Sequence, residues 1–214
     1  GYARASGGVG VAVATSGPGA TNLVTGIATA MLDSIPIVCV TGQVSSKVLG
    51  TDAFQEVDIT GITLPVTKHN FLVSRTEDIA PALREAFLIA KSGRPGPVLV
   101  DITKDAQQNS AVFDFAAAAP QPQRPHPMLG ADSDSMREAL ELLRNAKRPV
   151  ILAGHGILHS GALEQVRTLA ERAQIPVACT LLGLTSFPAS HPLNLGMMGM
   201  HGESWLNHAI QQAD

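Results

Sequence analysis

The sequence has little charge, few aromatic side chains and no long apolar run, and each shortage excludes a class of function. Of its 214 residues, 15% are charged and 4% are aromatic, and the net charge is −3. Because there is neither a basic stretch nor a base-stacking surface, we predict no nucleic-acid partner. No apolar run reaches the roughly 18 residues that cross a bilayer, so we predict no membrane segment.

Cysteine is almost absent as well. The two cysteines, Cys39 and Cys179, each lie inside a short apolar run. We predict that both are buried free thiols in a reducing compartment and, because no signal peptide is recognisable, that the protein is cytoplasmic. The chain begins at Gly1 without an initiator methionine and stops at Asp214, directly after a predicted helix. We therefore expect it to be an internal part of a longer polypeptide.

Apolar residues and glycine, in contrast, are abundant, at 45% and 20 residues respectively. Short β-rich runs alternate with segments of helical spacing along the chain. We predict strands at residues 9–15, 36–41, 68–73, 97–102, 149–153 and 176–180, and helices at residues 20–32, 77–91, 135–145, 161–174 and 203–212. This order predicts the α/β class, with two doubly wound domains built on parallel sheets.

A change in composition separates the two predicted domains. Residues 116–127 are almost entirely alanine, proline and glutamine, which is typical of a semi-rigid linker. We predict a first domain at residues 1–108, a linker at 109–132 and a second domain at 133–214. The second domain shows only about two clear strands, whereas such sheets usually have about five or six, so we expect it to be incomplete.

Three glycine-containing loops lie next to predicted helix starts. They are SGPG at residues 16–19, GHG at 154–156 and GMHG at 199–202. Glycine lets a backbone approach a ligand, and a helix N-terminus offers free N–H groups. A tight turn or a helix cap explains each loop equally well, so both interpretations stay open at this point.

Polar side chains suited to catalysis are few. Lys104 follows a predicted strand, and a loop at residues 50–56 contains an aromatic ring and an amide of the kind that lines a pocket. Glu56, in the same loop, is expected to face solvent. His201 and His208 lack the spacing of a metal pair, and there is no Cys/His cluster, Gly-x-Ser-x-Gly elbow or phosphate-loop lysine. We predict no metal ligand in this segment.

Taken together, several runs resemble the large catalytic subunit of the acetohydroxyacid synthases, also called acetolactate synthases. The resemblance covers nearly the whole chain, and GTDAFQE and MGMHG are its narrowest motifs. It rests on GYAR at residues 1–4, TSGPGATN at 15–22, TGQV at 41–44, GTDAFQE at 50–56, TKHN at 67–70, SGRPGP at 92–97, KD at 104–105 and GMMGMHG at 196–202.

The resemblance implies a reaction and its cofactors. Enzymes of this family use thiamine diphosphate and Mg²⁺ to decarboxylate pyruvate, and they add the resulting two-carbon carbanion to a second 2-oxoacid. Pyruvate or 2-oxobutyrate is that acceptor, and the products lead to branched-chain amino acids. The family also binds FAD, which has no net redox role in this carboligation.

The resemblance also implies roles for residues of the first domain. Pro18, Gly19 and Asn22 match the pocket for the cofactor's aminopyrimidine. Phe54 and Gln55 match residues that reach the active site of the partner subunit, and Lys104 matches a residue of the substrate channel. The family is oligomeric, so we expect a homodimer or tetramer with its active site at the subunit interface, and a small regulatory subunit is a further expected partner.

The FAD site is implied chiefly in the second domain. Arg94 of the first domain matches a residue that contacts the flavin cofactor. The others match three loops of the family's FAD site: Gly154, His155 and Gly156; Thr180, Leu181 and Leu182; and Met198, Gly199, Met200 and His201. Backbone amides at strand ends are suited to binding a diphosphate, which gives this assignment a physical reason.

Two positions depart from the commoner family pattern, and two functional parts are missing. Ser45 stands where many relatives have proline, and His155 stands where many have glycine. The family's catalytic glutamate is expected upstream of Gly1, and the Gly-Asp-Gly segment that holds diphosphate and magnesium is expected beyond Asp214. Because loss of a general acid or base costs roughly 10²–10⁴-fold, we predict that this chain alone is inactive.

Other functions remain open on the sequence alone. Another thiamine-diphosphate enzyme, such as a pyruvate oxidase or a glyoxylate carboligase, shares the SGPGATN run. A noncatalytic module that binds a nucleotide through the second domain, or a structural or regulatory protein without thiamine, belongs to a different class. The nucleotide-binding module predicts no effect of changing Gln55 or Lys104, and a full-length sequence that lacks the upstream glutamate would support the thiamine-free protein.

Overall fold

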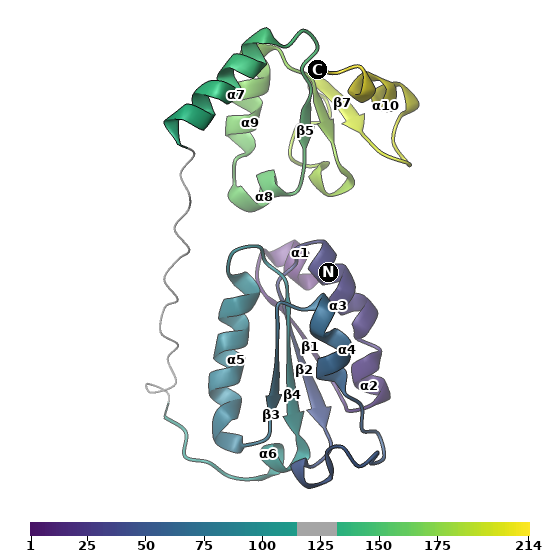
Figure 1. Ribbon diagram of the computed structural model, residues 1–214, viewed down its shortest axis with the longest axis vertical. Coiled ribbons are helices and arrows are strands. Elements are labelled where there is room, and N and C mark those ends of the chain that lie inside the picture. The colour runs from purple at the N-terminus through teal and green to yellow at the C-terminus, as the bar shows by residue number, and fades with distance from the viewer. Residues whose placement is uncertain (115–131) are drawn as a thin grey trace. The chain divides into compact units, whose positions relative to one another are not determined.

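The computed structural model describes residues 1–114 and 132–214. The chain divides into two compact units, Gly1–Met128 and Leu129–Asp214, and each is built around its own sheet (Figure 1). The predicted linker at residues 109–132 lies mostly outside the described residues. The predicted domain boundaries therefore stay predictions.

Unit 1 contains a four-stranded, fully parallel sheet with the strand order β1-β2-β4-β3. Its strands are β1 (Gly10–Ala14), β2 (Ile37–Gln43), β3 (His69–Val73) and β4 (Pro97–Thr103). All seven residues of β4 are buried, because this central strand is covered on both faces. All four strands begin and end close to where the apolar runs predict them.

The helices of unit 1 cover both faces of the sheet, as Figure 1 shows for α5 on one side and α3 and α4 on the other. They are α1 (Tyr2–Ser6), α2 (Pro18–Thr21), α3 (Val24–Leu32), α4 (Ile59–Thr63), α5 (Thr76–Lys91) and α6 (Lys104–Gln108), with short 3₁₀ turns η1 (Ser46–Val48) and η2 (Leu64–Val66). Successive strand residues alternate between the faces. Val98 therefore packs with Ala86 of α5, and Leu99 packs with Ile27 of α3 and Ile59 of α4. This arrangement confirms the predicted α/β class with parallel strands.

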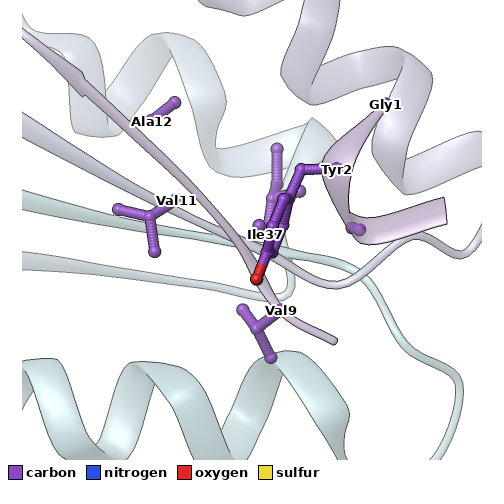
Figure 2. A pocket seen from close by; sticks show the side chains of 8 residues that line it. Gly1, Tyr2, Val9, Val11, Ala12 and Ile37 are labelled. Carbon is purple, nitrogen blue, oxygen red and sulfur yellow. The ribbon is translucent and has the colours of Figure 1, made fainter. Parts of the chain in front are cut away.

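β1 forms an edge of the sheet in the part of the chain that the structure describes. The side chains of Val11 and Val13 are 58% and 76% exposed, which is unusual for valines in a strand. Beside the start of β1 lies an open hollow of about 630 Å³, and its lining includes Tyr2, Val9 and Ile37 (Figure 2). The outer face of this strand is thus apolar and uncovered.

Unit 2 contains a three-stranded parallel sheet with the order β5-β6-β7. Its elements are α7 (Ser133–Asn145), β5 (Ile151–Ala153), α8 (Gly156–Ser160), α9 (Leu163–Ala173), β6 (Val177–Cys179), η3 (Leu181–Gly183), β7 (Asn194–Met197) and α10 (Ser204–Gln211). Its core is small and is formed by Ala153, Ala170, Val177, Cys179 and Phe187. None of the helices in the described part of the chain has the length and apolar character that a membrane span requires.

Several local predictions are corrected by the structure. The predicted helix at residues 20–32 is two helices, because the chain turns at Asn22 between α2 and α3. The predicted helix at 161–174 is confirmed as α9, but a separate short helix that was not predicted, α8, precedes it and ends at Gly161 in a left-handed conformation. Strand β7 was not predicted at all, because its sequence, NLGM, has no β-branched residue and contains a glycine. Both cysteines are buried free thiols, as predicted.

Candidate functional site

The turn after β1 requires glycine at two positions. Gly17 has φ +60°, and a Cβ atom at this position would lie 2.9 Å from the carbonyl oxygen of Gln55. A Cβ atom on Gly19 would lie 2.6 Å from Cγ2 of Thr15. Pro18 occupies the first turn of α2. Backbone N–H groups in this turn have no partner within the helix, so proline, which lacks the N–H, removes no hydrogen bond. The turn is therefore shaped to bring its backbone against the loop that contains Gln55.

The facing loop, residues 50–56, holds its two candidate residues in an exposed position. Gln55 has φ +61° and Asp52 has φ +56°, a left-handed conformation that is uncommon for residues other than glycine. The side chain of Phe54 is 90% exposed, and Gln55 is exposed as well. Strained backbone of this kind persists only where surrounding contacts enforce it, and it is concentrated at functional sites.

Glu56 provides part of that enforcement, a role that the sequence did not indicate. Its carboxylate accepts hydrogen bonds from the backbone N–H of Gly50 and, at 2.9 Å, from that of Ala53. These backbone bonds, the one from Gly50 first, lower the pKa of Glu56. The expected solvent-facing carboxylate instead closes its own loop, so Glu56 is not placed as a free general acid or base.

Lys104 begins α6, immediately after β4. Its neighbour Asp105 accepts hydrogen bonds from the hydroxyl of Ser46 and, at 2.9 Å, from the backbone N–H of Ser46, and these bonds lower the pKa of Asp105. The loops after β2 and β4 are thereby joined. Because the strands are parallel, Lys104 lies at the same edge of the sheet as the turn that contains Pro18 and Gly19.

Asn22 completes the group at this edge with its backbone. It is the C-cap of α2, and its backbone N–H donates to the carbonyl of Pro18 at 3.2 Å. Asn22 as a whole is exposed to solvent. The structure thus brings Gly17 and Gln55 into contact and places Pro18, Gly19, Asn22 and Lys104 at the carboxyl edge of one sheet.

A buried polar cluster lies beneath this edge, and sequence reasoning missed it. The Asp101 carboxylate accepts a hydrogen bond from the Thr41 hydroxyl at 2.7 Å and one from the Gln43 amide at 2.9 Å. Asp101 is only 1% exposed, and burial raises its pKa to about 6. The register Thr41↔Asp101 across β2 and β4 explains the contact. A carboxylate in the middle of an apolar strand is the signal that could have revealed it.

In unit 2, two of the three predicted loops are joined directly. Nδ1 of His155 lies 3.0 Å from the carbonyl oxygen of Leu182. A Cβ atom on Gly183 would lie 2.2 Å from the carbonyl oxygen of Ala153, so η3 packs closely on the end of β5. The Thr180 hydroxyl caps η3 by accepting from the N–H of Gly183 at 3.1 Å. Gly154 and Gly156 adjoin open space, so a ligand has room to approach the protein backbone at these positions.

The third loop follows β7 and is held by α10. The side-chain amide of Asn207 accepts from the N–H of Gly199 at 2.9 Å and donates to its carbonyl at 2.8 Å. Gly199 has φ +108°, and Met200 is 90% exposed. Because β5, β6 and β7 are adjacent and parallel, this loop, with Met198 and His201, shares one carboxyl edge with the loops at 154–156 and 180–182. Most of the residues predicted for FAD are therefore neighbours.

Arg94 is placed apart from the other candidate residues of unit 1. Its guanidinium donates to the Ser34 hydroxyl at 2.7 Å and to the carbonyl of Leu32 at 3.0 Å, which caps the end of α3. It precedes β4, so it lies at the amino edge of the sheet, opposite the turn at residues 16–19. Within residues 1–114 and 132–214, no group of three or more His, Cys, Asp or Glu side chains is arranged to hold a metal ion.

Comparisons with known proteins agree with this geometry. Residues 1–62 match the N-terminal TPP binding domain of thiamine pyrophosphate enzymes, and residues 136–214 match their central domain. Thiamine pyrophosphate is another name for thiamine diphosphate. The chain therefore belongs to the thiamine pyrophosphate enzymes, and it contains parts of two of their domains.

Within this family, the similarity to one group of proteins extends over the whole chain. It is 52% identical to the acetolactate synthase large subunit of Corynebacterium glutamicum over 214 residues, which are 100% of this chain and 34% of that protein. It is 49% identical to the acetolactate synthase isozyme 1 large subunit of Escherichia coli strain K12, covering 100% of this chain and 37% of that protein. A probable acetolactate synthase large subunit of Methanocaldococcus jannaschii is 48% identical, with coverages of 100% and 36%. The chain thus spans about a third of the length of these relatives.

Proposed function

We propose that the chain forms the pyrimidine-binding part and the FAD-binding part of a cytoplasmic acetolactate synthase catalytic subunit. The observation that carries this proposal is the contact between the glycine turn at residues 16–19 and the loop of Gln55, at the edge that also presents Lys104. The identity of 48–52% to acetolactate synthase large subunits, which extends over the whole of this chain, supports the same reaction. The proposed reaction condenses pyruvate with a second pyruvate or with 2-oxobutyrate. The buried, reduced thiols of both units support the cytoplasmic location.

The residues of the unit 1 edge fit an aminopyrimidine. Pro18 and Gly19 present a close-packed backbone beside a helix start, and the exposed amide of Gln55 both donates and accepts hydrogen bonds. Lys104 offers a positive charge for the carboxylate of a 2-oxoacid. Thiamine diphosphate, when bound, supplies the electron sink for decarboxylation. The role of this chain is then to orient the cofactor ring and the substrate and to exclude water.

The exposed ring of Phe54 supports an active site completed by a second chain. A phenylalanine that is 90% exposed at a loop tip leaves a large apolar surface uncovered. We propose that a partner subunit covers Phe54 and Gln55, which makes the functional protein a homodimer or tetramer. The same partner or a downstream domain supplies the magnesium ligands, and a small regulatory subunit is a further proposed partner.

The three neighbouring loops of unit 2 fit the diphosphate and ribose of FAD. Gly154 and Gly156 leave space beside free backbone, and Gly199 and Met200 are exposed at the same edge. We propose that His155 keeps its contact with Leu182 and so holds the first two loops in place for the cofactor. The contact of Arg94 with FAD stays a prediction, since its guanidinium is bonded to the end of α3.

The test uses the full-length subunit that contains this chain. We expect purified protein with thiamine diphosphate, Mg²⁺ and FAD to convert pyruvate to acetolactate, and Gln55→Ala to lower kcat about 10²-fold. The matched control is Gln165→Ala, which removes an exposed amide on α9 and leaves kcat unchanged. The 214-residue chain alone is expected to form no acetolactate.

Each rival function has a distinct outcome in the same assay. Peroxide release with bleaching of the flavin by pyruvate would instead identify an oxidase. Nucleotide binding without any thiamine-dependent turnover, unaffected by Gln55→Ala, would identify a noncatalytic module. Either result contradicts the proposed carboligase.

A further inference from the structure

We infer that Gln43, oriented by the buried Asp101, is a positioning residue that fixes the loop at residues 50–57 and therefore the placement of Gln55 against the turn at 16–19. The catalytic meaning of this placement rests on the proposed function. The placement itself is a property of unit 1 and is tested separately from activity.

The amide of Gln43 joins three separate parts of unit 1. Its Nε2 donates to the Asp101 carboxylate at 2.9 Å and to the backbone carbonyl of Val57 at 2.8 Å. Its Oε1 accepts from the N–H of Val44 at 2.8 Å. Both N–H hydrogens and the carbonyl oxygen are thus engaged, which fixes the side chain in one orientation. Gln43 is the link through which the central strands hold the end of the loop.

The loop is held at several points, and Gln43 supplies the buried one. Before the loop, Ser46 is bound to Asp105 of α6. Inside the loop, Glu56 binds the N–H groups of Gly50 and Ala53. At the end of the loop, Val57 is bound to Gln43, and the next residue, Asp58, caps α4. Only one residue separates Val57 from Gln55, so a shift of Val57 moves Gln55 away from Gly17.

Asp101 determines which way the Gln43 amide points. One carboxylate oxygen accepts from Thr41 and the other from Gln43, so the NH₂ end of the amide must face Asp101 and Val57. The reversed amide would place its oxygen against both a carboxylate and a carbonyl. The charge that acts on Asp101 is that of Asp58, another carboxylate, which raises the pKa of Asp101 and cannot take the place of the Gln43 amide as a donor.

Burying this cluster costs stability, which indicates that its role is to fix the position of the loop. Asp101 and Gln43 lie on the same face of the sheet as Cys39 and Leu99 of the same two strands, an apolar face where a hydrophobic side chain would pack without desolvating a charge. A buried hydrogen-bond network is energetically demanding but selects one geometry among several. The geometry selected in this case is that of a loop with two left-handed, non-glycine residues.

The decisive comparison is between Gln43→Met and Thr41→Val in the full-length subunit. Each removes one hydrogen bond to Asp101 with little change in side-chain volume, but only Gln43→Met also releases Val57. The readouts are hydrogen exchange of the amides at residues 47–57, kcat and KM for acetolactate formation, and the melting temperature. We expect Gln43→Met to raise exchange in this segment at least about tenfold and to lower kcat about 10–10²-fold, because small misplacements have such effects on rate.

The control variant separates positioning from general stability. Thr41→Val is expected to lower the melting temperature similarly but to leave both exchange at residues 47–57 and kcat within about threefold of the wild type. Asp101→Asn keeps an oxygen for Gln43 and a donor for Thr41, so it is expected to preserve the loop. If Gln43→Met does not fold, Gln43→Asn, whose shorter side chain reaches only one of its two acceptors, is judged by the same criteria.

Two outcomes overturn the inference. Equal exchange and equal kcat in the Gln43 and Thr41 variants would show that the cluster is structural only. An Asp101→Asn variant with a released loop would show that the carboxylate charge, and not the amide orientation, is what holds it. If even the wild type forms no acetolactate, the proposed function fails, and the exchange data alone decide whether Gln43 positions the loop.

Discussion

The two sheets of this chain present the same kind of edge but stabilise it differently. In unit 1, the loops at the carboxyl edge are tied by polar side chains, among them Gln43, Glu56 and Asp105. In unit 2, His155 joins two of the loops through the carbonyl of Leu182, and the loops are otherwise set by close packing at Gly183 and Gly202 and by hydrogen bonds between the side chain of Asn207 and the backbone of Gly199. Of the buried polar side chains in the described residues, Ser186 is the one that belongs to unit 2.

This difference matches the two different tasks that we propose for the edges. An edge that orients a side chain such as Gln55 needs its loops fixed to a fraction of an ångström, which hydrogen bonds to a buried anchor achieve. An edge that binds a diphosphate needs free backbone N–H groups and space, which glycine provides. In the proposed function, the same α/β framework serves a catalytic role in one unit and a binding role in the other.

The largest effect is expected where the glycine turn of unit 1 meets the loop. Gly17→Ala forces a side chain into a left-handed conformation and against the carbonyl of Gln55. We expect a loss of about 4 kcal/mol in the free energy of unfolding, because strain and overpacking add. Thermal unfolding followed by circular dichroism measures it. Gly154→Ala is the matched control in unit 2, since its Cβ atom meets open space; an equal loss in both variants would contradict the comparison.

Among the described residues, the carboxylate with a raised pKa is that of Asp101, in unit 1, whereas the shifted carboxylates of unit 2, such as Glu171, have lowered pKa values. The pKa of Asp101 is raised by burial from 3.8 to about 6, so this group favours folding below about pH 4 and loses that advantage as the pH rises through about 6. Asp101→Asn keeps its hydrogen bonds without the charge. Between about pH 4 and pH 7 the wild type is expected to lose roughly 3 kcal/mol relative to this variant.

Urea unfolding of both proteins over this pH range measures the difference. The single tryptophan, Trp205, lies on α10 of unit 2, so its fluorescence reports that unit separately from circular dichroism, which reports both. Parallel pH profiles of the wild type and Asp101→Asn would show that Asp101 has an ordinary pKa in the folded chain.

A smaller effect is expected when the packing of unit 2 is disturbed. Gly183→Ala places a Cβ atom 2.2 Å from the carbonyl of Ala153 and so separates η3 from β5. We expect about 2 kcal/mol less stability, observed as an earlier Trp205 transition, and about tenfold weaker FAD binding in the full-length subunit. Exchange at residues 47–57 should not change. A variant that binds FAD like the wild type would remove η3 from the proposed site.

The smallest effect concerns the two thiols, whose reaction rates compare how well the core of each unit is protected from solvent. Burial raises the pKa of Cys39 to about 11, and it raises that of Cys179 as well. At about pH 8 we expect both to react with a thiol reagent roughly 10²-fold more slowly than a free thiol, and Cys179 to react first, because its sheet has three strands rather than four. Single Cys→Ser variants assign the two rates. Rapid labelling of Cys39 in the folded chain would contradict its placement in the core.

The sequence predicts the framework of this molecule better than its site. The run PVLVDI predicts a buried strand, and the turn SGPG predicts a helix start, because both depend on neighbouring residues. The contact between Gly17 and Gln55 depends on a loop with two left-handed residues, which no local pattern indicates. The bond from Thr41 to Asp101 joins residues 60 positions apart, so only the strand register reveals it. Glu56 was misjudged for a similar reason, because its partners are backbone groups without a sequence signature.

The bare outer side of β1 has a practical consequence. An unshielded row of main-chain amides with Val11 and Val13 beside it is a template on which strands of other molecules can add. Concentrated solutions of the isolated chain should therefore form intermolecular sheets, and light scattering should grow with protein concentration. Keeping samples dilute, or introducing a lysine at position 13, would be the first measure for anyone who wishes to study unit 1 on its own.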